Sequence, residues 1–179
     1  MSQTKLDVWT VGHSTRPIGE FLETLKSFDI KVLIDVRSFP GSRRYPHFNR
    51  ELLRASLAGA GIEYHHFPEL GGRRPVQLDS NNMAWRNKTF RGYADYMETD
   101  QFREGVARLL EVASESRTSI MCAEAVWWRC HRSLISDYLK ANGVEVRHIM
   151  AAGKSESHPF TSAARIVNGQ LSYRGILED

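Results

Sequence analysis

Residues that can carry acid–base, nucleophilic or anion-binding chemistry concentrate in one stretch of the chain, between positions 118 and 139. The stretch contains two thiols, a carboxylate, an imidazole and two guanidinium groups: Cys122, Glu124, Arg129, Cys130, His131 and Arg132. It begins with an apolar run at 119–122, typical of a buried strand, and ends with apolar residues at helical spacing, 134–139. A strand-to-helix turn is where α/β proteins commonly place their chemistry.

The end of this stretch favours an anion site. No Ser, Thr, Asp or Asn immediately precedes the helix that starts near Cys130, so its first N–H groups are left free, and Arg132 lies in the first turn. The same position would lower the pKa of the Cys130 thiol and make it a better nucleophile. The alternative is that Cys130 is only a small buried hydrophobic residue.

Two cysteine chemistries can be tested by spacing. A phosphatase loop needs five residues between Cys and Arg, whereas Cys122 and Arg129 have six and no glycine, which disfavours that loop. The set Cys122, Cys130 and His131 matches no common structural zinc spacing, although a catalytic metal stays open as an alternative.

A third chemistry uses two carboxylates at neighbouring strand ends. Asp35 and Glu124 would share acid–base work, with His131 or His13 moving protons. The competing interpretation is that each carboxylate forms a structural ion pair, with Arg37 or Arg132, and both interpretations stay open.

The elements that must position these residues follow from hydrophobic periodicity. Strands are predicted at 7–12, 31–37, 62–67, 119–122 and 144–149, and helices at about 18–28, from 49 to 59 or 61, 91–97, 102–113 and from about 130. Polar residues follow three of the strands, at 12–14, 35–37 and 122–124. If the strand order is 3-2-1-4-5, these ends meet in a crevice between the first and fourth strands.

This pattern predicts a single α/β domain over residues 1–179. We expect a mostly parallel, Rossmann-like five-stranded sheet with helices on both faces, and a small C-terminal β-hairpin at about 164–174. Asn168-Gly169 between two alternating arms carries the hairpin prediction. The irregular segment 68–89 is long for a loop in a compact domain and is typical of functional loops.

Charge points to a partner rich in phosphate. The net charge of the 179 residues is only +3, yet residues 35–91 hold ten Arg and Lys against five acids. Arginine suits bidentate phosphate contact, although a solvated basic face is the competing interpretation. No apolar run approaches a membrane span, no signal peptide opens the chain, and two cysteines make no disulfide framework. We therefore expect a cytoplasmic protein with reduced thiols and no membrane partner.

Six ordered motifs resemble one known family. They are Gly12-His-Ser14, Asp35-Val-Arg-Ser-Phe-Pro40, Phe48-Asn49, Gly61-Ile-Glu-Tyr64, Glu69-Leu-Gly-Gly72, and Cys122-Ala-Glu124 with Cys130-His-Arg132. The sequence from about 8 to 160 resembles the domain of unknown function 488 family, a group of uncharacterised bacterial and archaeal proteins. The resemblance implies an α/β fold and emphasises these positions, without supplying a reaction or a cofactor.

The first functional hypothesis is an enzyme, or an enzyme-like pocket, for a phosphate-bearing small molecule or nucleic-acid end. Its anion-binding residues would be Arg132, Arg37, Ser14, Arg43 and Arg44, and its catalytic residues Glu124, Asp35, His131, His13 and Cys130. The alternative is a non-catalytic nucleic-acid-binding module, in which the arginines of 37–91 join Tyr45, Phe48 and Trp85 in a basic aromatic surface.

Overall fold

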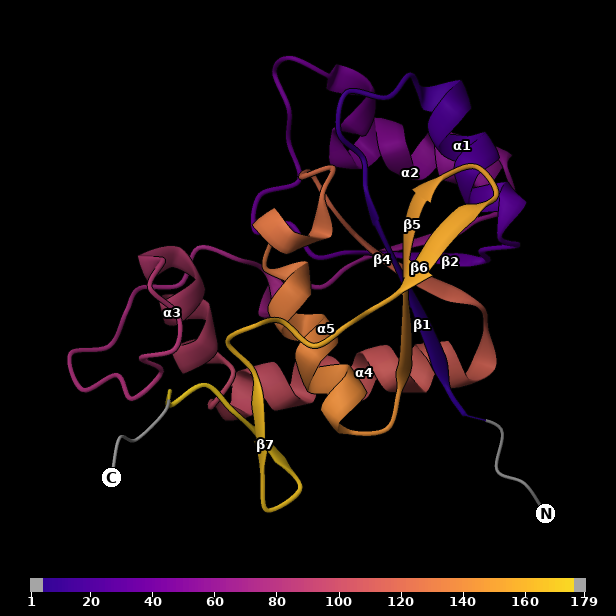
Figure 1. Cartoon of the computed structure of the whole chain (residues 1–179). Helices are drawn as coiled ribbons and strands as arrows, with labels where there is room; N and C mark the ends of the chain where they lie inside the picture. Colours follow the sequence, from indigo (N-terminus) through magenta and orange to yellow (C-terminus); the bar gives the residue numbers. More distant parts are fainter. Residues whose placement is uncertain (1–4, 176–179) are drawn as a thin grey trace.

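The computed structural model describes residues 5–175 and shows a mostly parallel sheet between two layers of helices (Figure 1). The strand order is β3-β2-β4-β1-β5-β6, in which β6 alone runs antiparallel, against β5. The strands are β1 (Asp7–Gly12), β2 (Val32–Asp35), β3 (Glu63–His66), β4 (Thr118–Cys122), β5 (Glu145–Ala151) and β6 (Lys154–Ser157). The α/β class and the parallel sheet predicted from the sequence are confirmed.

Two details of the predicted sheet are wrong. First, β4 lies between β2 and β1, so Ile120 pairs with Ile34 on one side and with Thr10 on the other. All five β4 residues are buried, which suits a central strand, but local periodicity does not encode the order of parallel strands. Second, residues 154–157 form a sixth strand, whose polar and mostly exposed residues are typical of a sheet edge and hid it from hydrophobic patterning.

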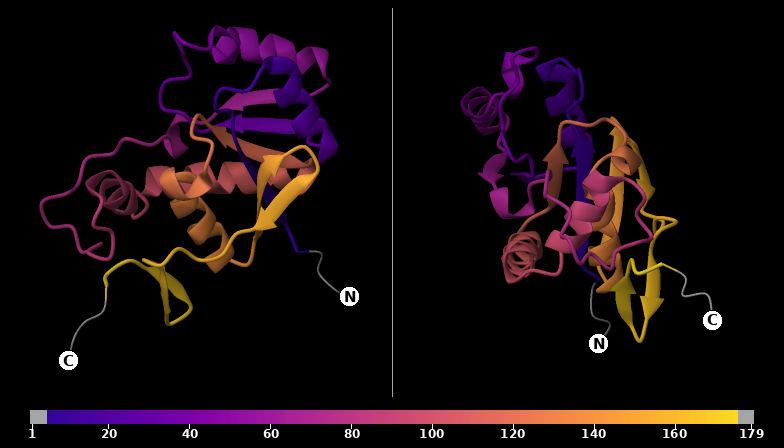
Figure 2. Two further views of the ribbon diagram at one scale, coloured as in Figure 1. Left: turned by 45° about the horizontal axis from the view of Figure 1, so that its top comes forward. Right: turned by 90° about the vertical axis from the view of Figure 1, so that its left-hand side faces the viewer.

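In the described part of the chain, five α-helices cover the sheet, two on one face and the remainder on the other (Figure 2). They are α1 (Ile18–Ser27), α2 (Arg50–Gly59), α3 (Lys88–Tyr96), α4 (Asp100–Glu115) and α5 (Arg132–Ala141). Phe21 of α1 and Leu53 of α2 enter one buried cluster, and Phe102 of α4 and Leu134 of α5 enter the other. Each such side chain contributes about 1.5–3 kcal/mol by leaving water. Within residues 5–175, the helices are too short or too polar to cross a bilayer.

The strand order still creates a crevice between β1 and β4. After β1 the chain continues through α1 on one face, and after β4 it continues through α5 on the other. The two strands are neighbours, with Gly12 paired to Cys122 at their carboxyl ends. A ligand crevice forms at such a point of divergence in open parallel sheets. The predicted meeting of the first and fourth strands is therefore confirmed, although β4 lies on the other side of β1 from that expected.

The C-terminal hairpin is confirmed. Strands β7 (Arg165–Val167) and β8 (Gln170–Ser172) pair antiparallel around Asn168 and Gly169. Both turn residues have positive φ, 51° and 77°, as a two-residue turn of the I′ type requires. The hairpin is tied to the main body by Tyr173, whose hydroxyl donates to Asp137 of α5 at 2.7 Å.

Candidate active site

A cleft of about 820 Å³ opens at the carboxyl ends of β1, β2 and β4. Its walls come from the loops after these strands, from Gly72 and Arg73, and from Thr89, Phe90 and Tyr93 of α3. Its volume lies in the range of small-molecule sites. The cleft therefore occupies the crevice that the strand order creates, and it includes most of the residues singled out by chemistry in the sequence.

Backbone pairing holds the loops after β1 and β4 together. The amides of His13 and Ser14 donate to the carbonyls of Cys122 and Ala123, both at 2.9 Å. The Glu124 carbonyl then passes directly over Gly12, where an added Cβ would lie only 1.8 Å from its oxygen. Position 12 therefore requires a residue without a side chain, because the two loops approach each other too closely for any other.

The two cysteines lie side by side at the floor of the cleft, with their Sγ atoms 2.6 Å apart. Cys130 has extended backbone two residues before α5, and its sulfur accepts a hydrogen bond from the amide N–H of Arg132 at 3.4 Å. Burial raises the pKa of the Cys130 thiol. The hydrogen bond from Cys122 and the charges of His131 and Arg132 outweigh burial and hold that pKa well below its ordinary value. Burial, and then the bond to Cys130, raise the pKa of Cys122 well above its own. Cys130 is thus the thiolate, and Cys122 is the thiol that donates to it.

Arg132 supports this assignment because its charge is buried. The side chain is 1% exposed, and no Asp or Glu among residues 5–175 lies within ion-pair distance of it. Its Nη2 donates to the Glu124 carbonyl at 2.7 Å, and its Nε makes no hydrogen bond within the described chain. A buried guanidinium without a nearby anion costs several kcal/mol, and the Cys130 thiolate supplies that anion. Burial lowers the pKa of Arg132, but the charges of the two sulfurs outweigh burial and raise that pKa above its ordinary value.

The geometry therefore does not favour the predicted contact between Arg132 and a bound anion. Arg132 does not line the cleft; it lies behind the sulfurs and holds the Glu124 carbonyl. The sequence located it in the first turn of α5 but did not reveal which way the side chain points. A residue in the first turn can reach either outward to a ligand or back into the sheet. Here Arg132 reaches back, and its Nη1 donates a hydrogen bond to Thr10 Oγ1 of β1 at 3.1 Å.

His131 is placed to exchange a proton with Cys130. Its Nε2 donates to the Val36 carbonyl at 3.0 Å, which leaves Nδ1 facing the Cys130 sulfur at 3.6 Å. Gly72 closes against the ring, because a Cβ at that position would meet Nδ1 at 3.0 Å. A nucleophile, an adjacent base and a third group that orients the base form the arrangement of nucleophilic enzymes.

A buried chain of hydrogen bonds continues from Arg132 away from the cleft. Arg132 donates to Thr10 Oγ1, whose hydroxyl donates to His148 Nδ1 at 2.6 Å. His148 Nε2 then donates to His158 Nδ1 at 2.8 Å, and His158 Nε2 donates to Asp137 Oδ1 at 2.8 Å. The directions are consistent with two neutral imidazoles. Burial foremost, followed by the charges of His158 and Arg132, lowers the pKa of His148 to about 2. The chain joins a buried cation to a buried carboxylate and fixes Arg132 in place.

Sequence reasoning missed this network, although a signal was present. Thr10 and His148 are polar residues at inward positions of strands, and Asp137 lies among apolar residues of α5; all three are fully or almost fully buried. Asp137 also accepts the Thr161 amide at 3.0 Å and the hydroxyls of Thr161 and Tyr173 at 2.6 and 2.7 Å. Buried polar groups in a pattern otherwise apolar indicate a hydrogen-bonded network.

Asp35 forms the structural pair that was the competing interpretation. It is 0% exposed and binds the Arg37 guanidinium at 2.7 Å, while the Tyr64 hydroxyl donates to it at 2.6 Å. Burial, and then the charge of Asp35, raise the pKa of that hydroxyl. The predicted acid–base role of Asp35 does not fit this geometry, because its oxygens are occupied and do not reach the cleft. Arg37 lines the cleft, but its charge is already paired.

His13 also lies at the cleft, in a neutral form. Its Nδ1 donates to the Ser14 carbonyl at 2.8 Å, and its ring stacks on Phe48 at 4.1 Å. Burial foremost lowers its pKa to about 4. His13 can therefore accept a hydrogen bond at Nε2, but it stays unprotonated near neutral pH.

Three exposed arginines give the cleft its positive charge: Arg44, Arg73 and Arg129. None of them has an acidic partner within ion-pair distance among the described residues, and Glu124 is the one carboxylate in the lining. The predicted Arg43 is exposed but does not line the cleft. Sequence reasoning did not place Arg73 or Arg129 among the anion-binding residues of the first hypothesis, although Arg73 belonged to the predicted basic surface 37–91 and to the segment 68–89 marked as a functional loop. Arg73 has φ 59°, so its backbone is held in an unusual conformation.

The basic aromatic surface predicted over 37–91 is not continuous. Phe48 is fully buried in the core, and Trp85 packs against Tyr173 of the hairpin region at 5.5 Å. Tyr45 lines the cleft, and Phe39, 78% exposed, projects from its rim. Phe48 and Trp85 of the predicted set pack inside the protein. Composition alone does not distinguish such buried aromatic residues from aromatic residues exposed for binding.

The alternative metal site at Cys122, Cys130 and His131 is not supported by the arrangement. Within residues 5–175, no three or more His, Cys, Asp and Glu side chains are grouped so that they could hold a metal ion. His131 directs Nε2 to a backbone carbonyl, and the two sulfurs contact each other.

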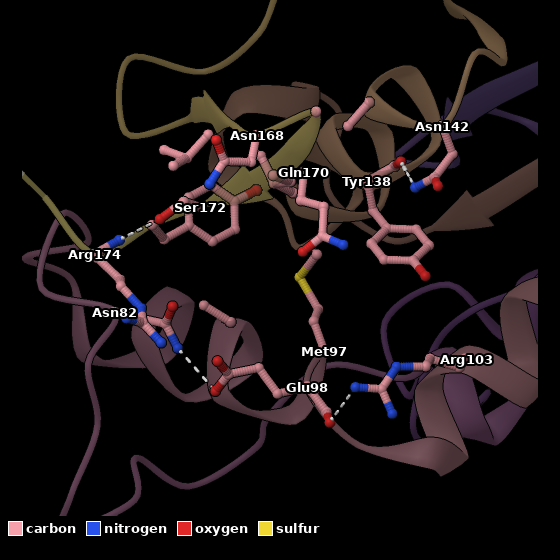
Figure 3. Close-up of a pocket in the computed structure, with 16 residues that line it drawn as sticks. Asn82, Met97, Glu98, Arg103, Tyr138, Asn142, Asn168, Gln170, Ser172 and Arg174 are labelled. Carbon is pink, nitrogen blue, oxygen red and sulfur yellow. Dashed lines mark hydrogen bonds between the residues drawn. The ribbon is translucent and has the colours of Figure 1, made fainter.

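A second cleft, of about 570 Å³, lies between the hairpin and the helices and is drawn in Figure 3. Gln170 and Ser172 of β8 face Met97 and Arg103 across it. Arg103 donates to the Glu98 carbonyl at 2.8 Å, so part of the polar lining is already satisfied. This cleft contains no cysteine or histidine, and we therefore place the candidate chemistry at the strand ends.

Comparison with known families matches residues 17–139 to one whose description is Domain of unknown function DUF488. The match covers more than half of the chain. The chain belongs to this family. The matched residues of DUF488 include both cysteines, His131 and Arg132, whereas His13 and Ser14 precede them and His148 and His158 follow them. No curated protein and no solved structure matches the chain.

Proposed function

We propose that this DUF488 protein is an enzyme that binds a phosphate-bearing ligand, a nucleotide or a nucleic-acid end, in the cleft at the strand ends. The observation that carries the proposal is a buried arginine that has no carboxylate partner among residues 5–175 and interacts with the sulfurs of Cys122 and Cys130. It makes Cys130 a thiolate on the wall of a cleft lined by unpaired arginines. A reactive nucleophile and an anion-attracting surface in one cleft favour an enzyme over a structural role.

Arg44, Arg73 and Arg129 would hold the anion. They come from three separate loops, so their charges converge only in the folded chain. Arginine binds phosphate through paired N–H groups, and each charge-assisted hydrogen bond contributes about 1.5–3 kcal/mol. Ser14 also lines the cleft and offers a hydroxyl that can donate to a phosphate oxygen.

The Cys130 thiolate, with its proton passed to His131 Nδ1, would attack the phosphorus of the ligand; an S–P bond would form, the P–O bond to the leaving group would break, and the leaving oxygen would take up a proton. The Val36 carbonyl holds the imidazole so that Nδ1 faces the sulfur. Glu124, exposed at the mouth of the cleft, is the one lining carboxylate available to move a proton for the ligand. Cys130, His131 and Glu124 thus retain the catalytic roles predicted from the sequence. Asp35 and Arg132 instead take positioning roles.

The proposal is tested by calorimetric titration with inorganic phosphate, AMP, ATP and a 5′-phosphorylated oligonucleotide. We expect at least one of these to bind, and Arg73→Ala and Arg129→Ala each to weaken it by about tenfold or more. Arg86→Ala is the matched control, because Arg86 is exposed but does not line the cleft. The proposal fails if none of the four compounds binds, or if Arg86→Ala weakens binding as much as the cleft variants.

A nucleic-acid-binding module without catalysis is the second candidate, favoured by Phe39. Its ring is 78% exposed at the cleft rim, where it is available to stack on a base. Binding to a nucleic-acid backbone should fall steeply with salt, because each neutralised phosphate releases counterions. A steep salt slope, loss of binding in Phe39→Ala and unchanged binding in Cys130→Ser would favour this candidate over the enzyme.

A further inference from the structure

The two cysteines form a pair whose geometry goes beyond what the proposed function needs. They are the only cysteines in the sequence; Cys122 ends β4, and Cys130 lies two residues before α5. Their sulfurs are 2.6 Å apart, roughly half an ångström more than a disulfide bond of about 2.05 Å. Closing that bond therefore needs only a small movement of the turn between them.

The surroundings of the two sulfurs differ in a way that gives each a distinct role. Cys130 accepts the Arg132 amide and faces both the Arg132 charge and His131, so it carries the negative charge. The Arg132 charge also acts on Cys122, whose sulfur lies 3.9 Å from the Glu124 carbonyl. No imidazole of the described residues is bonded to that sulfur, however, and burial foremost raises its pKa, so Cys122 is the thiol of the pair. In two-thiol chemistry the thiolate attacks first and the second thiol then displaces the product.

Access to the sulfurs selects the co-reactant. Cys122 and Cys130 line the cleft, yet they are only 3% and 6% exposed, so they lie at its floor. The sulfurs of a disulfide in another folded protein cannot reach that depth. A small neutral molecule such as a hydroperoxide can, and the thiolate is the form of cysteine that hydroperoxides oxidise.

We propose that Cys130 and Cys122 form a redox site that reduces a small hydroperoxide, with Cys130 attacking and Cys122 resolving. The Cys130 thiolate attacks one peroxide oxygen, the O–O bond breaks, and the leaving alkoxide or hydroxide takes up a proton to give alcohol or water. Cys130 becomes a sulfenic acid. The Cys122 sulfur then attacks the Cys130 sulfur, the S–O bond breaks, and water leaves with the Cys122 proton. Two thiols and one hydroperoxide thus give one disulfide, one alcohol or water, and one water.

The full chain, reduced and then freed of reductant, is the material for the test. One equivalent of hydrogen peroxide should lower the intact mass by two hydrogens, remove both free thiols and leave a monomer, with a cross-linked peptide joining 122 and 130. Cys122→Ser should stop at the sulfenic acid of Cys130, which dimedone traps. Cys130→Ser should react no faster than an unfolded thiol, while circular dichroism confirms that both variants fold.

The rate gives the test its scale. Because the pKa of Cys130 is held well below its ordinary value, the folded chain carries more of the reactive thiolate at mildly acidic pH than the unfolded chain does. Because nucleophilicity falls with pKa, we expect Cys130 in the folded chain to react about ten to a hundred times faster than in urea. Equal rates, a disulfide between two chains, or dimedone labelling of Cys122 would overturn the proposal. Disulfide formation by a small organic disulfide but not by peroxide would also overturn it. None of these readouts involves a phosphate ligand, so failure here and failure of the anion cleft are separate results.

Discussion

Replacing Gly12 by alanine tests how the turns after β1 and β4 position the site. The added Cβ would lie 1.8 Å from the Glu124 carbonyl oxygen and 2.9 Å from Arg132 Nη2. Ordinary contact begins near 3.4 Å, so the Glu124 turn must move by about 1.6 Å. That movement breaks the 2.7 Å hydrogen bond from Arg132 to the carbonyl.

The expected loss of stability follows from two effects. A buried hydrogen bond from a charged group is worth about 1.5–3 kcal/mol, and overpacking a close contact costs about 1–3 kcal/mol. We therefore expect Gly12→Ala to lower the free energy of unfolding by about 3–5 kcal/mol, measured by urea denaturation. We also expect slower alkylation of Cys130, because the added Cβ would press on Arg132 Nη2 and displace the guanidinium from beside the sulfurs.

Gly19→Ala is the matched control for this change. Gly19 lies in the first turn of α1 with open space around its Cα, so alanine there should be neutral or raise stability by up to about 1 kcal/mol. If Gly12→Ala and Gly19→Ala unfold at the same urea concentration and Cys130 keeps its alkylation rate, the close approach of the two turns is refuted.

Two further predictions concern the buried polar network and pH. Asp137→Asn should lower the free energy of unfolding by about 2–4 kcal/mol, because an amide N–H₂ would face hydrogen-bond donors that now meet a carboxylate. Asp79 is exposed, so the control Asp79→Asn should change the free energy of unfolding by no more than about 0.5 kcal/mol. A smaller loss for Asp137 than for Asp79 would contradict the network. Stability should also fall as pH drops below about 6.5, because His13 and His148 have folded pKa values lowered to about 4 and about 2, so the unfolded chain binds protons first. Urea denaturation near pH 5 should show a slope of about 2–3 kcal/mol per pH unit, and no slope between pH 7 and 5 would show that these imidazoles are not buried neutral.

The sequence predicted the parts of this protein that depend on local pattern. The apolar run of β4, the helical spacing of 134–139 and the Asn168-Gly169 turn each determine one element, and all three are present. The order of the parallel strands was not predictable in this way. β4 could pair on either side of β1, and only packing of the whole sheet places it against β2.

The site was predicted in location better than in role. Polar residues after three strands marked the cleft, and Cys130 and His131 lie in it. The direction of a long side chain, however, depends on partners distant in sequence. Arg132 points to Thr10, 122 residues away, and Asp35 binds Tyr64 from the neighbouring strand. Such partners are invisible to spacing, so the sequence did not show that Arg132 holds the Glu124 carbonyl or that Asp35 is paired with Arg37; the roles expected of Arg132 and Asp35 in binding and catalysis stay predictions.

The central claim is that Cys130 is a thiolate because the hydrogen bond from Cys122 and the charges of His131 and the buried Arg132 favour its charged form. The direct measurement is the iodoacetamide alkylation rate of Cys130 against pH, with the modified peptide identified by mass spectrometry, in the wild-type chain and in Arg132→Met. We predict that the wild-type rate falls off only well below the pH at which an ordinary thiol titrates, and that in Arg132→Met the fall begins at higher pH. A wild-type rate that already follows the ordinary titration, unchanged by Arg132→Met, would contradict the account.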